Sequence, residues 1–235
     1  MLQVPAGYGR GVRLGALFTM WIAAPWALLV FPLAIIVQNV TGAGPYHPLD
    51  AAGLEQAGKF PAMIMLEHAF DGFWHFAFFL PLLAVTVAIA RRWPARAALL
   101  FFLAAASLLF GWAKTLIAIY TVLPVGAHYM AADAAGKAAI LATGTSYDGL
   151  YTGLQSMDTY PIVLAFILVA LLPAESGLSR WIRGLGWVLA VTLGVPFDDL
   201  LGLSLPVFFL VGIVVLPAFF ILLGRWLIRV PISSP

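Results

Sequence analysis

The sequence LEHAFDGFWH, residues 66–75, opens an apolar run that extends to Ala90. Its first turns hold four ionisable side chains, at Glu67, His68, Asp71 and His75. On a helix, positions three, four or seven residues apart lie on one face. The run is long enough to cross a bilayer. The stretch therefore predicts a transmembrane helix with a polar face at one end.

The composition indicates one integral-membrane domain covering residues 1–235. The chain is 63% hydrophobic and 9% charged, with a mean hydropathy of +1.02, whereas soluble domains carry about a quarter charged residues. It has no cysteine, which excludes disulfides, thiolate metal sites and cysteine nucleophiles. The net charge is +2, and the basic residues fall at the ends of the predicted helices. This distribution indicates membrane topology and does not point to a nucleic-acid partner.

The fold class predicted from this pattern is an all-α transmembrane helix bundle with six spans. Each span needs about 20 mainly apolar residues. The uncharged run at 14–37 exceeds the apolar core of a signal peptide, roughly 7–15 residues, and so predicts an uncleaved first span. Residues 38–65 and 121–149 are expected to form long outer loops. The predicted spans are 14–37, 66–90, 97–120, 150–172, 184–200 and 205–228.

The basic residues predict the orientation. With both termini cytoplasmic, nine arginines lie inside and only Lys59, Lys114 and Lys137 lie outside, as the positive-inside rule requires. The expected location is the bacterial cytoplasmic (inner) membrane, in a multi-pass arrangement with the lipid bilayer as a partner. All acidic residues except Glu175 then face outward, which makes the outer face electronegative.

A weak internal repeat is compatible with three helical hairpins. Asp-Ala-Ala-Gly occurs at 50–53 and again at 133–136, and Arg-Trp recurs near the inner end of three spans. Interfacial preferences of Trp and Arg, together with chance matches in an Ala- and Gly-rich chain, explain the same pattern without a duplication.

The polar face of the second span admits three interpretations. His and carboxylate side chains at this spacing can converge on a divalent metal ion, with Glu67, His68, Asp71 and His75 as ligands. The same side chains can face a polar ligand without metal. They can also be the solvated end of a helix that overshoots the bilayer.

Asp158 is the deepest predicted carboxylate, roughly 21 Å along a helix from Leu172. A charge inside a membrane is expensive and by default functional, although a purely structural ion pair is the alternative. Lys114 either snorkels to the interface or pairs with Asp158, Asp71 or Asp198.

The ionisable residues lie at a similar predicted depth, which suggests an outward-facing polar pocket. The fifth span is short and contains Pro196, a feature that recurs at transporter binding sites. Trp74, Trp112, Tyr147 and Tyr151 are expected to surround the pocket. The candidate ligand-binding residues are Asp71, His75, Lys114, Asp158, Tyr160, Asp198 and Asp199.

The turn LPAESGLSRWIRGLG, residues 172–186, runs straight into the fifth span. With the long loops after spans one and three, it resembles a bacterial six-span integral-membrane family known only as a domain of unknown function. The resemblance implies the six-span layout and carries no activity.

Three functions remain open from the sequence. The first is binding of a small ligand or cation in the outward-facing pocket, for transport, sensing or an accessory role. The second is a metal-dependent enzyme acting on a lipid-like substrate at the outer leaflet, with Asp158 as catalytic base. The third is a structural subunit of a larger membrane complex, with other membrane proteins as partners. The sequence lacks a GxSxG, Walker or dinucleotide-binding motif.

Overall fold

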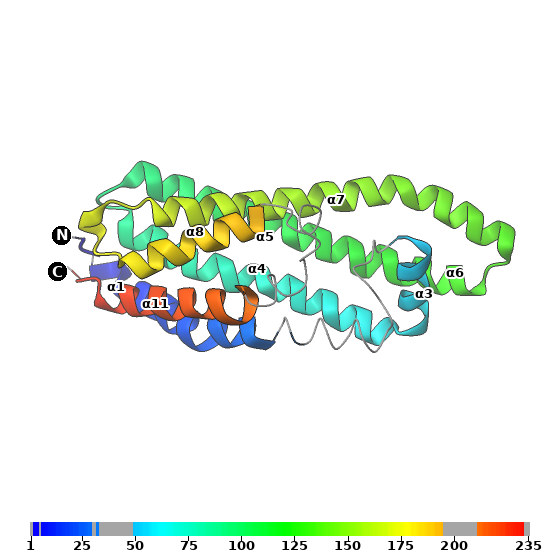
Figure 1. The fold of residues 1–235 in the computed structure, drawn as a ribbon, viewed down its shortest axis with the longest axis horizontal. Coiled ribbons are helices and arrows are strands. Elements are labelled where there is room, and N and C mark those ends of the chain that lie inside the picture. The colour runs from blue at the N-terminus through cyan, green and yellow to red at the C-terminus, as the bar shows by residue number, and fades with distance from the viewer. Residues whose placement is uncertain (1, 5, 30–31, 33–48, 195–210, 233–235) are drawn as a thin grey trace. The chain divides into compact units, whose positions relative to one another are not determined.

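The computed structural model describes residues 2–4, 6–29, 32, 49–194 and 211–232. These residues are largely helical, and no strand occurs among them apart from an isolated parallel bridge between Val4 and Ile232. The predicted all-helical class is confirmed. In chain order (Figure 1) the elements are α1 Ala6–Phe18, η1 Thr19–Ala23, α3 Ala51–Lys59, α4 Pro61–Ile89, α5 Pro94–Ile117, η2 Ala118–Val122, α6 Leu123–Ala131, α7 Ala134–Ala170, η3 Ala174–Ser176, α8 Arg180–Gly194, η4 Val211–Val215 and α11 Leu216–Arg229.

Five helical stretches of the described chain are long and apolar enough to cross a membrane. Each corresponds to one predicted span. The remaining prediction, span 184–200, starts within α8, and its outer end lies outside the described residues. The count of six therefore stays a prediction. The five stretches are Gly7–Leu29, Pro61–Ile89, Pro94–Ala131, Ala134–Ala170 and Val211–Arg229.

The predicted long loop at 121–149 is wrong. These residues are helical apart from a short break at Ala132 and Asp133. Pro124 lies in the first turn of α6, where proline is tolerated. The alanines that surround the break favour a helix. At 37 residues, α7 is about 55 Å long.

The described part of the predicted loop 38–65 is also helical, since it holds α3 and the start of α4. The Asp-Ala-Ala-Gly repeat is the start of a helix in both places. Asp50 Oδ1 accepts a hydrogen bond from the Gly53 N–H at 2.7 Å, and Asp133 Oδ1 accepts one from the Gly136 N–H at 2.8 Å. Aspartate is a favoured N-cap because its side chain satisfies a free amide of the first turn. Local capping explains the repeat, and the three-hairpin duplication stays a prediction.

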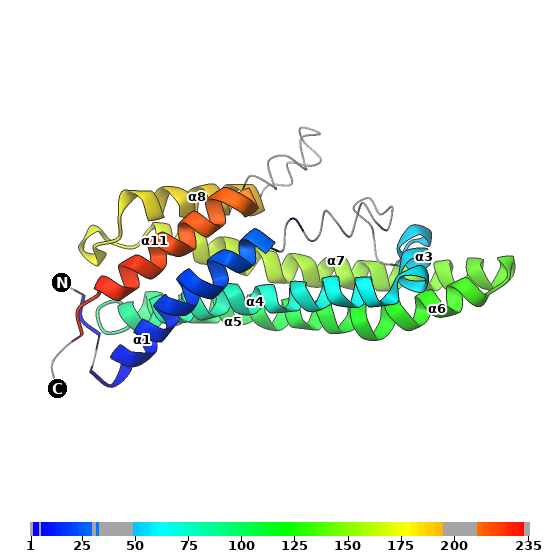
Figure 2. The ribbon, with the colours of Figure 1, turned by 90° about the horizontal axis from the view of Figure 1, so that it is seen from below.

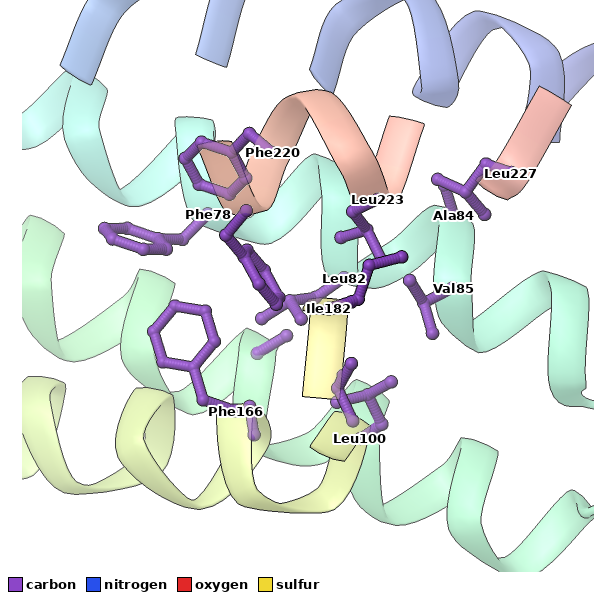
Figure 3. Packing of buried hydrophobic residues seen from close by; sticks show 14 of the residues in the cluster. Phe78, Leu82, Ala84, Val85, Leu100, Phe166, Ile182, Phe220, Leu223 and Leu227 are labelled. Carbon is purple, nitrogen blue, oxygen red and sulfur yellow. The ribbon is translucent and has the colours of Figure 1, made fainter. Parts of the chain in front are cut away.

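The chain divides into two compact units, each described by itself. Unit 1 comprises Met1–Phe31, Trp74–Leu108 and Asp158–Pro235. Its core is a cluster of large apolar side chains from α4, α5, α7, α8 and α11, shown in Figure 3. The ring of Phe78 lies 5.7 Å from that of Phe166 and 5.6 Å from that of Phe220.

Small residues allow α1 to pack closely within unit 1. A Cβ atom added at Gly15 would lie 2.5 Å from the Cβ of Ala84 on α4, and one at Gly224 of α11 would lie 2.9 Å from the carbonyl oxygen of Ala16. Such contacts are typical of helices that pack in membranes. α1 and α11 lie side by side (Figure 2), and the Val4 N–H donates to the Pro231 carbonyl at 2.8 Å.

Arg183 holds the turn between α7 and α8 in unit 1. Its guanidinium donates to the carbonyls of Ala170, Leu172, Pro173 and Leu178. The last carbonyls of a helix have no partner within the helix, so this side chain satisfies the end of α7. In the sequence analysis this basic turn served to predict orientation. The structure shows that its Arg183 also stabilises the turn through hydrogen bonds to backbone carbonyls.

Unit 2 comprises Pro32–Phe73 and Leu109–Met157. In it α3 packs against α6 (Figures 1 and 2), and both helices have a glycine at the contact. A Cβ at Gly126 would lie 2.7 Å from the Cβ of Ala57 and 2.9 Å from the Leu54 carbonyl oxygen. One cluster of buried apolar residues in this unit consists of Leu49, Leu54, Ala57, Ala118, Val122 and Tyr129.

Candidate functional site

The strongest candidate site is a buried histidine–aspartate pair in unit 1, formed by His75 of α4 and Asp158 of α7. The His75 Nε2 atom lies 3.7 Å from Asp158 Oδ2, and the two side chains are only 7% and 5% exposed. The Thr159 hydroxyl donates to the other carboxylate oxygen, Oδ1, at 2.8 Å. The carboxylate therefore presents one oxygen to a hydroxyl and the other to an imidazole.

Aromatic and aliphatic side chains adjoin this pair along both helices. Phe78 follows His75 by three residues on α4, and its ring meets Trp74 edge to face at a centroid distance of 4.5 Å. On α7, the buried Ile162 and Phe166 follow Asp158 by four and eight residues. Because i, i+3 and i, i+4 positions share a helix face, His75 and Asp158 lie on the same helix faces as these apolar side chains. A low-polarity environment strengthens charge interactions and makes an uncompensated charge costly.

The chemistry of the pair is that of a switchable charge. With a neutral imidazole and an ionised carboxylate, its net charge is −1. One added proton gives an imidazolium–carboxylate pair or a carboxylic acid beside a neutral imidazole, and either form is neutral. Histidine is the side chain whose ordinary titration falls nearest physiological pH. The arrangement can therefore bind a proton or another small cation and release it again.

An ion pair lies in unit 2, between Asp71 of α4 and Lys114 of α5. The Lys114 Nζ atom is 3.0 Å from Asp71 Oδ2, with the side chains 10% and 33% exposed. Of the two interpretations of Lys114, the structure favours pairing over snorkelling, and it selects Asp71 as the partner. A Cβ added at Gly72 would lie 3.1 Å from the Thr115 Cγ2 atom, so the glycine allows α5 to approach here.

Unit 2 also contains buried polar atoms without a hydrogen-bond partner among the described residues. They are His68 Nε2, Thr115 Oγ1 and Gln56 Oε1. His68 is 5% exposed and lies one turn before Asp71 on α4. Buried polar atoms are nearly always hydrogen-bonded, so these three mark unused binding capacity. Sequence reasoning did not single out Thr115 or Gln56.

The structure places four of the predicted site residues in two pairs, one in each unit. His75 and Asp158 form one pair, and Asp71 and Lys114 form another. The Tyr160 side chain is 59% exposed, and Trp112 and Tyr147 are also exposed. Glu67 is half-buried. Asp198 and Asp199 lie outside the described residues.

The metal ligands predicted on α4 are Glu67, His68, Asp71 and His75. Across the described ranges, no group of three or more His, Asp or Glu side chains is placed to hold a metal ion. Asp71 and His75 have partners on other helices instead. The divalent metal site therefore stays a prediction from spacing alone, without support from the arrangement of the side chains.

No protein-family model, curated protein or solved structure matches the chain. The resemblance of residues 172–186 to a six-span family consequently stays an expectation, and the functional argument rests on the two pairs and the helices that carry them.

Proposed function

We propose that the chain is an integral membrane protein of six crossings that binds a small cation, in exchange for a proton, at the His75–Asp158 pair. The observation that carries the proposal is the burial of both ionisable side chains on helices long and apolar enough to cross a membrane. Ionisable residues inside membranes are rare and usually belong to ion or proton pathways. This narrows the small ligand expected from the sequence to a cation.

The parity of the crossings supports the count of six. The bridge between Val4 and Ile232 joins the two described ends of the chain, so both ends belong on one side of a membrane, which requires an even number of crossings. The described chain supplies five long apolar stretches. α8 is the element that can begin the sixth. The arginines near these ends favour the cytoplasmic side.

The helical rise supports the depth of the pair. We take Ile89 and Ala170, which precede basic turns, as the inner ends of α4 and α7. His75 then lies about 21 Å from that boundary and Asp158 about 18 Å, inside a hydrocarbon core of about 30 Å. These two depths are counted along each helix separately. They agree without use of the distance between the two side chains. The same count on α4 places Asp71 about 27 Å from the inner boundary, close to the outer interface.

The electrostatics supports a cation as the ligand. An isolated negative charge at this depth is unfavourable, and a bound cation or proton removes it. The Thr159 hydroxyl donates a hydrogen bond to Asp158 Oδ1. The other oxygen, Oδ2, faces His75, and it is there that a proton or a cation would bind. A fall in pH should weaken cation binding because the proton occupies the same pair.

Thermal unfolding of the detergent-purified protein tests this proposal. At constant ionic strength, sodium or potassium chloride should raise Tm relative to choline chloride, since a ligand bound only to the native state stabilises it by about 2.7 kcal/mol at 100 times its Kd. The rise should shrink at lower pH and be absent in Asp158→Asn. The control Glu55→Gln removes an exposed carboxylate and should keep it. A cation-specific rise that persists in Asp158→Asn, or no rise with either salt, would contradict the proposal.

A further inference from the structure

A cavity of about 390 Å³ lies in unit 1, where the turn before α8 meets the last turns of α11. The two ends of the chain contribute to its wall through Leu2 and Pro231. It uses none of the residues of the cation site.

Two arginines give this cavity a positive side. Arg225 and Arg229 lie one helical turn apart on α11, both line the cavity, and both are exposed. Neither forms an ion pair with any residue that the structure describes, in contrast to Arg183, whose guanidinium is occupied by backbone carbonyls. Guanidinium groups bind phosphate oxygens in a fork geometry, so this side of the cavity suits a phosphate.

One carboxylate faces the same space. Glu175 belongs to the short helix η3 and lines the cavity, and it has no ion-pair partner within the described ranges. The next turn is fixed by Gly177, whose φ of 68° is readily adopted only by glycine, and by a hydrogen bond from Trp226 Nε1 to the Ser176 carbonyl at 3.0 Å. The carboxylate therefore extends from an anchored turn. It can accept hydrogen bonds from a cationic N–H group.

The remaining lining is mostly aromatic and apolar, with the serines Ser176 and Ser179. Trp181, Ile182 and Leu222 line the cavity beside the charged groups. Tryptophan and arginine are characteristic of the membrane interface, and basic pockets on the cytoplasmic side of membrane proteins bind phospholipid headgroups. A ligand with a phosphate, an ammonium and an apolar body matches all three parts of the lining.

We propose that this cavity binds the headgroup of a phospholipid bearing a primary ammonium, with its phosphate on Arg225 and Arg229 and its ammonium on Glu175. Trp181 and Leu222 contact the apolar part of the same lipid. The inference rests on the membrane crossing in the proposed function but not on the cation site. A choline headgroup has the same phosphate but no N–H to donate, so the site discriminates between the two headgroups.

Native mass spectrometry of the detergent-purified protein, with phosphatidylethanolamine and phosphatidylcholine added in turn, measures this binding. Wild type should retain the ethanolamine lipid about tenfold better than the choline lipid, as expected for one charge-assisted hydrogen bond. Arg225→Gln/Arg229→Gln should lower retention of both lipids by about tenfold or more. Glu175→Gln should abolish the preference, because it lowers retention of the ethanolamine lipid more than that of the choline lipid, which loses charge attraction but no hydrogen bond.

Matched variants separate this site from general charge and from the cation site. Arg10→Gln/Arg13→Gln removes two exposed arginines of α1 that do not line the cavity, and it should bind like wild type. Asp158→Asn should also bind like wild type, so a failure of the cation proposal would leave the lipid result standing. Thermal unfolding in the same detergent shows that each variant is folded.

Three results would overturn the lipid site. The first is equal retention of the two lipids by wild type. The second is unchanged binding in Arg225→Gln/Arg229→Gln. The third is displacement of the bound lipid by soluble phosphoethanolamine at equal concentration, which would show that the free headgroup, and not a lipid, is the ligand.

Discussion

The two compact units bury apolar and polar side chains in different proportions. Unit 1 buries a large apolar cluster built around Phe78, Phe166, Phe219 and Phe220. Its buried polar side chains are those of Thr19, His75, Ser107, Asp158 and Ser176. Unit 2 buries a small apolar cluster. Beside that cluster it buries four polar side chains, those of Gln56, His68, Lys114 and Thr115.

The difference indicates two sources of stability. In unit 1, close packing of large apolar side chains dominates, because helices in a membrane associate mainly through van der Waals contacts. Unit 2 has a smaller apolar cluster, so polar pairing and the close α3–α6 contact at glycine make up a larger share of its packing. Truncation of a large side chain should therefore lower stability most in unit 1. In unit 2, stability should instead be sensitive to added side-chain volume at a glycine contact and to the loss of a polar pair.

The largest effect is expected for Phe166→Ala in unit 1. Phe166 is fully buried, and its ring lies 5.2 Å from that of Phe219. Loss of this ring should lower the free energy of unfolding by about 3–5 kcal/mol, measured by denaturant titration in detergent. Phe102→Ala is the matched control, because Phe102 is 67% exposed. Comparable losses in the two variants would contradict the assignment of the core.

The next effect is expected for Gly126→Ala in unit 2. The added Cβ would lie within 3 Å of both Ala57 and Leu54, so α6 must move from α3 at a cost of about 2 kcal/mol. Gly153→Ala is the control with the opposite sign. A Cβ there meets nothing within 4 Å, and alanine in a helix should stabilise by about 0.5–1 kcal/mol. Stabilisation by both substitutions would show that the α3–α6 contact is not close.

A smaller effect is expected for the Asp71–Lys114 pair. A double-mutant cycle with Asp71→Leu and Lys114→Met should give a coupling energy of about 1 kcal/mol, since each single change leaves the other charge unpaired. Thermal or denaturant unfolding measures the four corners of the cycle. Additive single effects, with no coupling, would mean that the pair does not contribute to unit 2.

The smallest effect is expected for the exposed pair of Glu55 and Lys59 on α3. Its atoms are 2.9 Å apart, but the side chains are 44% and 50% exposed. The hydrogen bond from Lys59 lowers the pKa of Glu55 below its ordinary value of 4.5. Because this pKa is lowered on folding, the pair's contribution is present above pH 4.5 and is lost as pH falls through the folded value.

Carbon NMR of the Glu55 carboxyl measures that pKa directly. Lys59→Gln should return it toward 4.5, and the free energy of unfolding should be unchanged within error because the pair is solvated. A pKa that stays low in Lys59→Gln would assign the shift to another group.

The sequence predicted the fold class because apolar runs of 20 or more residues leave few alternatives. It also brought attention to His75, Asp158 and Lys114, since ionisable residues in such runs are conspicuous. It failed at residues 121–149, where alanine-rich polar helices resemble loops when only hydropathy is considered. It also could not assign partners, because Asp71 and His75 share a helix face but are paired with residues about 40 and 80 positions away.

The most direct test of the cation site is nitrogen NMR of the protein labelled with ¹⁵N-histidine. The chain has four histidines, so single substitutions assign every imidazole signal. The account predicts that Asp158→Asn changes the pH titration of His75, that sodium shifts this titration in wild type, and that His128 is unaffected by either. A His75 titration that is identical in wild type and Asp158→Asn, with and without sodium, would contradict the proposal that the two residues form one cation-binding pair.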